Sequence, residues 1–115
     1  MKKSESKIQQ EIYLHFHNNY CLKNHNPRGL IFSVPNESSS LSDTIYKKNI
    51  GLLPGVADLI VCRPCGELVF VEVKDDKGKQ SPKQIDFQQR VTKLGFRYLL
   101  VRSLEDFITQ ISKAS

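Results

Sequence analysis

The feature that most constrains this chain of 115 residues is a pair of short apolar runs joined by a tight connection. Residues 59–62 and 68–71 are rich in β-branched and aromatic side chains, and a proline and a glycine lie between them. This pattern predicts the two strands of a β-hairpin. If the strands pair symmetrically about Cys65, Asp58 faces Glu72, so the sequence predicts two neighbouring carboxylates.

The polar residues of the predicted hairpin gather at one end of one face. Side chains alternate along a strand, so each residue can be assigned to a face. One face carries Asp58, Ile60, Cys62, Leu68, Phe70, Glu72 and Lys74, and the other carries Leu59, Val61, Val69, Val71 and Val73. Because both faces are mostly apolar, we expect a sheet that is covered on both sides.

Asp58 and Glu72 need a partner if they face each other in a partly buried position. Opposed carboxylates repel, and burial raises the cost, so a proton, a lysine or a metal ion must lie between their oxygens. A hard divalent cation is the best candidate, because such cations prefer oxygen ligands. The alternative is an ordinary ion pair between Glu72 and Lys74 at the rim of the sheet, with Asp58 as a turn residue.

Four segments together resemble the compact VRR-NUC branch of the PD-(D/E)XK nuclease superfamily. The segments are GVAD at residues 55–58, EVK at 72–74, SPKQ at 81–84 and YLLVRS at 98–103. The resemblance spans nearly the whole chain and departs from the family pattern at two positions. Ala57 stands where the family usually has a proline, and Ser103 stands at the third position of the arginine motif, which leaves Arg102 as its single arginine. It implies an α/β fold with a PD-(D/E)XK restriction-endonuclease-like core, in a single domain over residues 1–115.

The resemblance also implies roles for individual residues. It implies that one or two Mg²⁺ or Mn²⁺ ions are held by Glu5, Asp58, Glu72 and the backbone carbonyl of Val73. It further implies that Lys74 positions the attacking water and that Gln84 lies beside the active site. The predicted catalytic residues are therefore Asp58, Glu72, Lys74 and Gln84. Glu11 is a second candidate for the ligand on the first helix, and Glu5 could instead only stabilise the helix dipole.

The charge balance favours a polyanionic partner. The chain has 17 Lys and Arg against 12 Asp and Glu, which gives a formal net charge of +5 and an isoelectric point near 9.2. The residues expected to contact DNA are Lys77, Lys79, Lys83 and Arg102. The alternative for the lysines is a solvated loop whose positive charge is diluted by Asp75 and Asp76.

Three cysteines, an odd number, argue against a disulfide framework and favour a reducing compartment. No apolar stretch follows the basic N-terminal residues, so no secretory signal is expected. No segment is long enough to span a bilayer. We therefore expect a soluble protein in the cytoplasm of a bacterial cell or of a phage-infected host.

Helix and strand signals predict the order α-β-β-β-α-β-α, a mixed β-sheet flanked by helices. The expected elements besides the hairpin are helices over residues 5–19, 82–94 and 104–113, strands over 30–34 and 96–101, and a polar connection over 35–54. Ser81 and Gln84 form a predicted capping box, which would by itself explain Gln84. The last strand follows a helical crossover, so it should lie parallel to the strand that ends in EVK.

The first and last helices are each expected to bury one apolar stripe. The stripes are Ile8, Ile12, Phe16 and Tyr20 on the first, and Leu104, Phe107, Ile108 and Ile111 on the last.

The resulting hypothesis is a metal-dependent endonuclease that hydrolyses phosphodiester bonds in DNA and leaves, by resemblance, a 5′-phosphate and a 3′-hydroxyl. The resemblance suggests branched DNA, such as a four-way (Holliday) junction, as the substrate and a homodimer as the active form. One alternative is a zinc-stabilised binding module built from Cys62 and Cys65 with Cys21 and His25. The other is a nucleic-acid-binding module that keeps the nuclease fold without catalysis.

Overall fold

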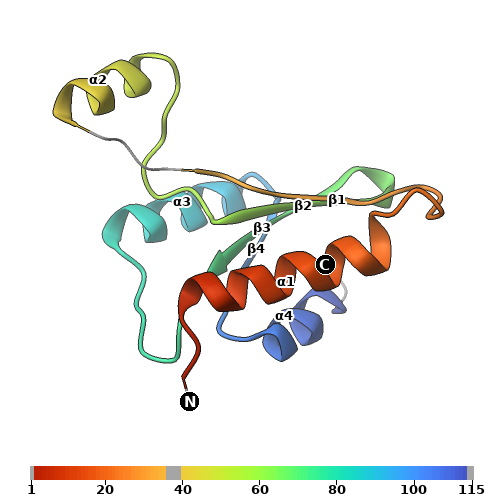
Figure 1. Cartoon of the computed structure of the whole chain (residues 1–115). Coiled ribbons are helices and arrows are strands. Elements are labelled where there is room, and N and C mark those ends of the chain that lie inside the picture. The colour runs from red at the N-terminus through yellow and green to blue at the C-terminus, as the bar shows by residue number, and fades with distance from the viewer. Residues whose placement is uncertain (1, 36–39, 114–115) are drawn as a thin grey trace.

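The computed structural model describes residues 2–35 and 40–113, and it has a four-stranded mixed sheet flanked by helices (Figure 1). The strand order is β1-β2-β3-β4, so each strand lies beside its neighbour in sequence. The elements are α1 (Glu5–Tyr20), β1 (Leu30–Ser33), α2 (Leu41–Asn49), β2 (Leu59–Arg63), the 3-10 helix η1 (Pro64–Gly66), β3 (Glu67–Val73), α3 (Pro82–Lys93), β4 (Arg97–Val101) and α4 (Leu104–Ile111). This architecture confirms the predicted mixed sheet and its flanking helices.

β2 and β3 form the predicted hairpin in the predicted register. Leu59 pairs with Val71 and Arg63 pairs with Glu67, so the pairing is symmetric about Cys65. The connection is tight because Cys65, inside η1, adopts the left-handed conformation with a φ of 67°. The same register brings the residue before β2 close to the end of β3.

Sheet hydrogen bonds continue beyond the strand ends at the edge where the predicted site lies. β4 is parallel to β3, as the crossover predicts, and the backbone N–H of Lys74 donates to the carbonyl oxygen of Val101 at 3.0 Å. β1 is antiparallel to β2, and the N–H of Val34 donates to the carbonyl oxygen of Asp58 at 3.0 Å. The backbones of Asp58 and Lys74 are therefore fixed although both residues lie just outside the strands.

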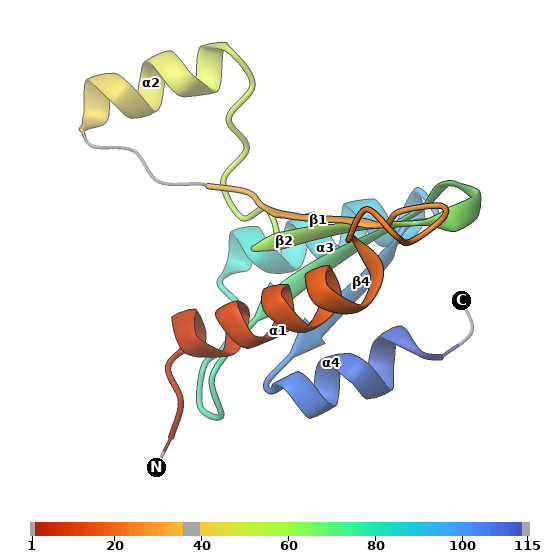
Figure 2. The same ribbon diagram turned by 45° about the vertical axis from the view of Figure 1, so that its right-hand side comes forward.

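Helices cover both faces of the sheet (Figure 2). α1 and α4 cover one face and form the main core, which contains Ile8, Ile12, Phe16, Leu59, Val61, Val69, Val71, Val73, Leu99, Val101, Phe107 and Ile111. α3 covers the other face through Phe87 and Val91, which pack against Phe70 and Tyr98. This division confirms the predicted faces of the hairpin. Among the described residues, no helix is both long and apolar enough to cross a membrane.

The helix boundaries agree with the predicted caps. Ser4 and Ser103 each accept a hydrogen bond from the backbone N–H of the third residue of α1 and α4. Ser81 and Gln84 form a complete capping box at the start of α3. After the end of α3, Gly95 has a φ of +96°, which favours glycine at a helix C-terminus.

The prediction of an unstructured connection over residues 35–54 is wrong, because it contains α2. Ser40 caps this helix, and its Oγ accepts a hydrogen bond of 3.0 Å from the N–H of Asp43. No residue of α2 is buried, and the helix projects from the rest of the fold (Figures 1 and 2). Its apolar side chains, Leu41, Ile45 and Tyr46, recur at helical spacing but are all exposed, and so short a run between polar residues is a weak helix signal. Residues 36–39 of this connection lie outside the described residues.

Two side chains of the expected apolar stripes lie at the surface instead. Tyr20 is 51% exposed at the last position of α1, where it packs on the Phe16 ring with centroids 4.8 Å apart. Ile108 on α4 is 36% exposed, whereas Phe107 on the same helix is fully buried. The buried stripes are therefore narrower than the sequence predicts.

Candidate active site

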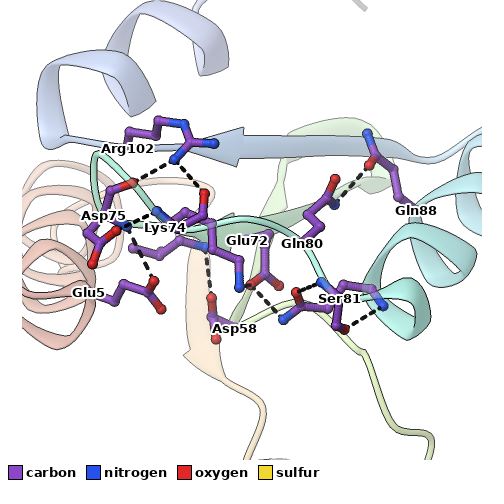
Figure 3. A network of polar contacts seen from close by, with 12 residues as sticks. Glu5, Asp58, Glu72, Lys74, Asp75, Gln80, Ser81, Gln88 and Arg102 are labelled. Atoms are coloured by element: carbon purple, nitrogen blue, oxygen red, sulfur yellow. Dashed lines mark hydrogen bonds and ion pairs between the residues drawn. The ribbon is translucent and has the colours of Figure 1, made fainter.

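Asp58 lies directly before β2, in a turn that packs against two other elements. Its Oδ2 atom accepts a hydrogen bond of 2.7 Å from the backbone N–H of Val73 on β3 (Figure 3). A Cβ atom on Gly55 would lie 2.5 Å from the carbonyl oxygen of Lys83, and Gly55 has a φ of +91°. Only glycine fits both this close approach and this conformation, so the segment that leads to Asp58 packs against the start of α3 at Gly55.

Glu72 lies beside Asp58, near the end of β3, and is only 1% exposed. Its Oε2 atom accepts a hydrogen bond of 3.1 Å from Gln84 Nε2 and lies 3.6 Å from Lys74 Nζ. Its Oε1 atom is buried and has no hydrogen-bond partner in the described part of the chain. A buried carboxylate oxygen without a partner is costly unless it binds a proton or a cation.

The two carboxylates interact as the hairpin register predicts. Burial, and then the negative charge of Asp58, raise the pKa of Glu72 from its ordinary value of 4.5 to about 8. The Lys74 ammonium lowers this pKa, but it does not offset the other two causes. Near neutral pH Glu72 therefore keeps a proton beside Asp58 even with Lys74 nearby, and the two carboxyl groups can both ionise only if a further cation lies next to them.

Gln84 has both of the roles expected from the sequence, since it caps α3 and lies beside the candidate active site. Its Oε1 accepts a hydrogen bond of 2.8 Å from the backbone N–H of Ser81, which completes the capping box. Its Nε2 then points to Glu72 and donates to it. The helix cap therefore orients the amide so that it binds one oxygen of Glu72.

The structure distinguishes the two acidic candidates on α1. The Oε2 atom of Glu5 accepts a hydrogen bond of 3.3 Å from the N–H of Asp75, which directly follows Lys74 (Figure 3). Glu11 instead pairs with Lys3 at 2.8 Å. Glu5 is therefore the carboxylate that α1 brings to the loop after β3.

Comparison with known proteins identifies the family. The sequence profile of the VRR-NUC domain matches residues 4–105. This chain belongs to the VRR-NUC domain family. Domains of this family are generally nucleases and act on DNA.

Two solved structures share the fold of this VRR-NUC domain. A VRR_NUC domain protein superposes with a TM-score of 0.73 at 18% sequence identity, over 96% of this chain and 87% of that chain. A second structure, a VRR_NUC domain, gives a TM-score of 0.66 at 24% identity, over 98% of this chain and 100% of that chain. These neighbours agree with the predicted PD-(D/E)XK-like fold. No curated protein matches this chain.

The four residues expected to contact DNA fall into two groups. All four side chains are exposed, and Lys77, Lys79 and Lys83 lie in the loop after β3 and at the start of α3. Arg102 instead uses its Nη1 atom to donate to the carbonyl oxygen of Asp75 at 2.6 Å and to that of Gly78 at 2.8 Å. Its guanidinium therefore contacts the domain's own backbone.

The candidate active site around Asp58 and Glu72 contains carboxylate oxygens that could bind a metal ion. Within residues 2–35 and 40–113, no three His, Cys, Asp or Glu side chains lie close enough together to hold a metal ion by themselves. The site offers the pair Asp58 and Glu72, with Glu5 in the adjoining loop contact. Mg²⁺ is usually bound by one or two carboxylates together with water and substrate phosphates, so this arrangement fits such an ion. Glu72 Oε1 is an available donor atom.

The zinc-stabilised alternative finds no support in the cysteine positions. Cys21 is buried, whereas Cys65 is exposed in the hairpin turn. His25 Nδ1 accepts a hydrogen bond of 2.9 Å from the backbone N–H of Leu22, so this ring nitrogen already has a partner. These residues form no ligand group of three within the described ranges.

Sequence reasoning missed a polar cluster on the α3 side of Glu72. Gln80 Nε2 donates to Gln88 Oε1 at 2.9 Å (Figure 3). The same Nε2 atom donates to the Tyr98 hydroxyl at 3.2 Å. Burial raises the pKa of Tyr98, and the negative charge of Glu72 adds to this effect. Alternation along β4 could have placed Tyr98 on the face of Phe70, but no local pattern links it to Gln80.

Proposed function

We propose that this VRR-NUC domain is a divalent-metal-dependent endonuclease that hydrolyses phosphodiester bonds in DNA. The observation that carries the proposal is Glu72 Oε1, a buried acidic oxygen that has no hydrogen-bond partner among the described residues. It belongs to a carboxylate that already interacts unfavourably with Asp58. Such a group is costly to bury, and a cation bound between the two carboxylates would remove both sources of the cost.

The proposed chemistry assigns a role to each polar group. Bound Mg²⁺ or Mn²⁺ would lower the pKa of a coordinated water and stabilise the negative charge that develops on the phosphoryl oxygens. Asp58 and Glu72 would hold the ion, and Glu5 and the backbone carbonyl of Val73 would be the further ligands. Lys74 orients the attacking water and acts as a fixed cation facing the transition state.

Contacts around Lys74 and Gln84 support these roles. The backbone of Lys74 is tied to Val101, and its Nζ lies 3.6 Å from Glu72 Oε2, so the ammonium group stays next to the carboxylates. Gln84 binds the same Oε2 atom and is itself held by Ser81. Both groups therefore contact one oxygen of Glu72 and leave Oε1 for the metal ion.

We further propose branched DNA, such as a four-way junction, as the substrate. The exposed lysines of the loop after β3 and of the start of α3 lie next to the site, where they would contact phosphates; they are Lys77, Lys79 and Lys83. One domain carries one candidate site, so cutting two strands of a junction requires a homodimer. Sedimentation of the protein alone and with junction DNA tests this, and a monomer in both experiments excludes the homodimer.

A cleavage panel tests the activity itself. Four-way junctions, flaps, single strands and linear duplex are incubated with Mg²⁺, Mn²⁺ or EDTA, using the wild type, Asp58→Ala and Lys74→Ala. Lys93→Ala, which removes an exposed charge at the far end of α3, is the matched control. We expect cleavage only with a metal ion, and binding without cleavage for both site variants.

Two outcomes of this panel contradict the proposal. Cleavage that survives in both site variants, or that persists in EDTA, removes this site or its metal from the mechanism. Binding of every DNA structure by the wild type without cleavage in either metal favours the alternative of a non-catalytic binding module.

A further inference from the structure

The loop that follows β3 is closed by its own first side chain. Asp75 Oδ1 accepts hydrogen bonds from the backbone N–H of Lys77 at 3.0 Å and of Gly78 at 2.6 Å. These bonds fold residues 75–78 into a compact turn directly after Lys74. This turn is called the Asp75 loop below.

Arg102 anchors the Asp75 loop from the end of β4. Its Nη1 atom donates to the carbonyl oxygens of Asp75 and Gly78, the first and last residues of the loop (Figure 3). Hydrogen bonds from a charged donor are stronger than neutral ones, and this donor spans both ends of the turn. The backbone N–H of Arg102 donates in turn to Asp106 Oδ2 at 3.0 Å, which ties the arginine to the first turn of α4.

The backbone of the Asp75 loop lies against two predicted site residues, Glu5 and Lys74. The N–H of Asp75 donates to Glu5 Oε2. A Cβ atom on Gly78 would lie 2.8 Å from Glu5 Oε2 and 3.2 Å from Lys74 Cδ, so no larger residue fits there without displacing one of the two side chains. The loop is therefore the element that places the Glu5 carboxylate relative to Lys74.

We propose that Arg102 is a positioning residue, which acts through the Asp75 loop to hold Glu5 and Lys74 at the edge of the site that contains Asp58 and Glu72. This inference rests on the proposed function, since it assigns Glu5 to the metal ion and Lys74 to the attacking water. The expectation that Arg102 contacts a DNA phosphate stays a prediction beside it, since only the Nη1 atom of this exposed side chain makes the loop contacts. Contacts of this kind, which orient a ligand without touching the metal ion, typically change metal affinity or activity about 10-fold to 100-fold when they are removed.

The test compares Arg102→Ala and Arg102→Lys with Lys93→Ala, which removes one exposed positive charge away from the loop. Single-turnover cleavage is measured against Mn²⁺ and Mg²⁺ concentration. DNA affinity is measured against salt, and the thermal midpoint of the protein alone is measured with and without Mn²⁺.

For Arg102→Ala we expect cleavage to slow by about 10-fold to 100-fold, with a higher metal concentration needed for half-maximal rate. We also expect a smaller thermal shift with Mn²⁺ alone, and a salt dependence of DNA binding equal to that of Lys93→Ala. Arg102→Lys should recover part of the rate, because an ammonium group can still donate to one of the two carbonyls. Gly78→Ala, which perturbs the same contact from the other side, should weaken the response to Mn²⁺ in the same direction.

Three results would overturn the inference. A normal rate at saturating DNA, with a salt slope reduced by about one, would make Arg102 a phosphate contact. Unchanged behaviour in every assay would leave it without a role, and loss of folding in both Arg102→Ala and Gly78→Ala would make the loop purely structural. If the wild type cleaves no DNA, the proposed function fails, while the Mn²⁺ thermal shift still reports whether Arg102 controls the metal ligands.

Discussion

Replacing Glu72 with Gln should stabilise the metal-free protein at pH 8 and above. Glu72 is almost fully buried beside Asp58, and its pKa of about 8 lies well above the ordinary 4.5. Between these two values the folded chain binds a proton that the unfolded chain has released. This contribution to the free energy of unfolding is therefore complete below about pH 4.5, and it is lost as pH rises through about 8.

The size of the effect follows from the same pKa difference. Each pH unit between the two pKa values is worth about 1.4 kcal/mol, so ionising Glu72 in the folded protein costs on the order of 3 to 5 kcal/mol. A glutamine has nearly the same shape. Its carbonyl oxygen can accept from Gln84 Nε2, and its amide can donate to Asp58, so the substitution replaces a repulsion with a hydrogen bond. For a domain of this size, the thermal midpoint should rise by about 10 to 20 °C at pH 8.5.

The assay is thermal and urea unfolding of the wild type and Glu72→Gln, in EDTA and in Mg²⁺ or Mn²⁺, at about pH 5 and about pH 8.5. Glu105→Gln, which neutralises an exposed carboxylate on α4, is the control. Metal should stabilise the wild type at the higher pH, because binding to the folded state alone adds to its stability, and should do little for Glu72→Gln. A Glu72→Gln protein that is less stable than the wild type in EDTA at pH 8.5 would refute the reasoning.

Three further predictions concern the fold and the surface. Gly55→Ala should destabilise the chain by about 2 kcal/mol or more and slow cleavage, because the new methyl group meets a carbonyl of α3 at a position with a φ of +91°; urea unfolding and cleavage assays check this. Phe107→Ala should cost about 3 to 5 kcal/mol in urea unfolding, since this ring is fully buried between α1 and the sheet. Lys79→Ala and Lys83→Ala should each weaken DNA binding and reduce its salt slope by about one, and an unchanged slope would exclude a phosphate contact at that lysine.

The sequence predicted the local part of the site well. The alternation of side chains, together with a tight turn, determines the hairpin register, and the register alone brings Asp58 to Glu72. The capping box at Ser81 is likewise a pattern within four residues. Each of these features depends on neighbours in sequence or on a single strand pairing, so the residue pattern contains most of the required information.

The parts that the sequence did not reveal depend on contacts between distant elements or on the absence of packing. Arg102 reaches a loop that precedes it by 24 residues or more, and nothing near Arg102 in the sequence indicates that its donors bind carbonyl oxygens. The place of Gln84 beside the site was expected from the family resemblance alone, because its bond to Glu72 depends on α3 starting beside the end of β3. α2 was missed for a different reason, since it is a helix of nine residues whose apolar side chains, Leu41, Ile45 and Tyr46, are all exposed.

Glu72 is buried in the sheet although its charge does not stabilise the fold. β3 supplies Val69, Val71 and Val73 to the main core, and all three are almost fully buried. On the opposite face of the same strand, Glu72 is buried to the same degree, although a neutral side chain of its shape would avoid both the repulsion from Asp58 and the partnerless oxygen. Packing therefore gives no reason for a carboxylate at this position. A bound cation does give a reason for a carboxylate here, because it needs two negatively charged oxygens side by side. The stability of metal-free Glu72→Gln therefore measures most directly whether Glu72 is present for binding rather than for folding.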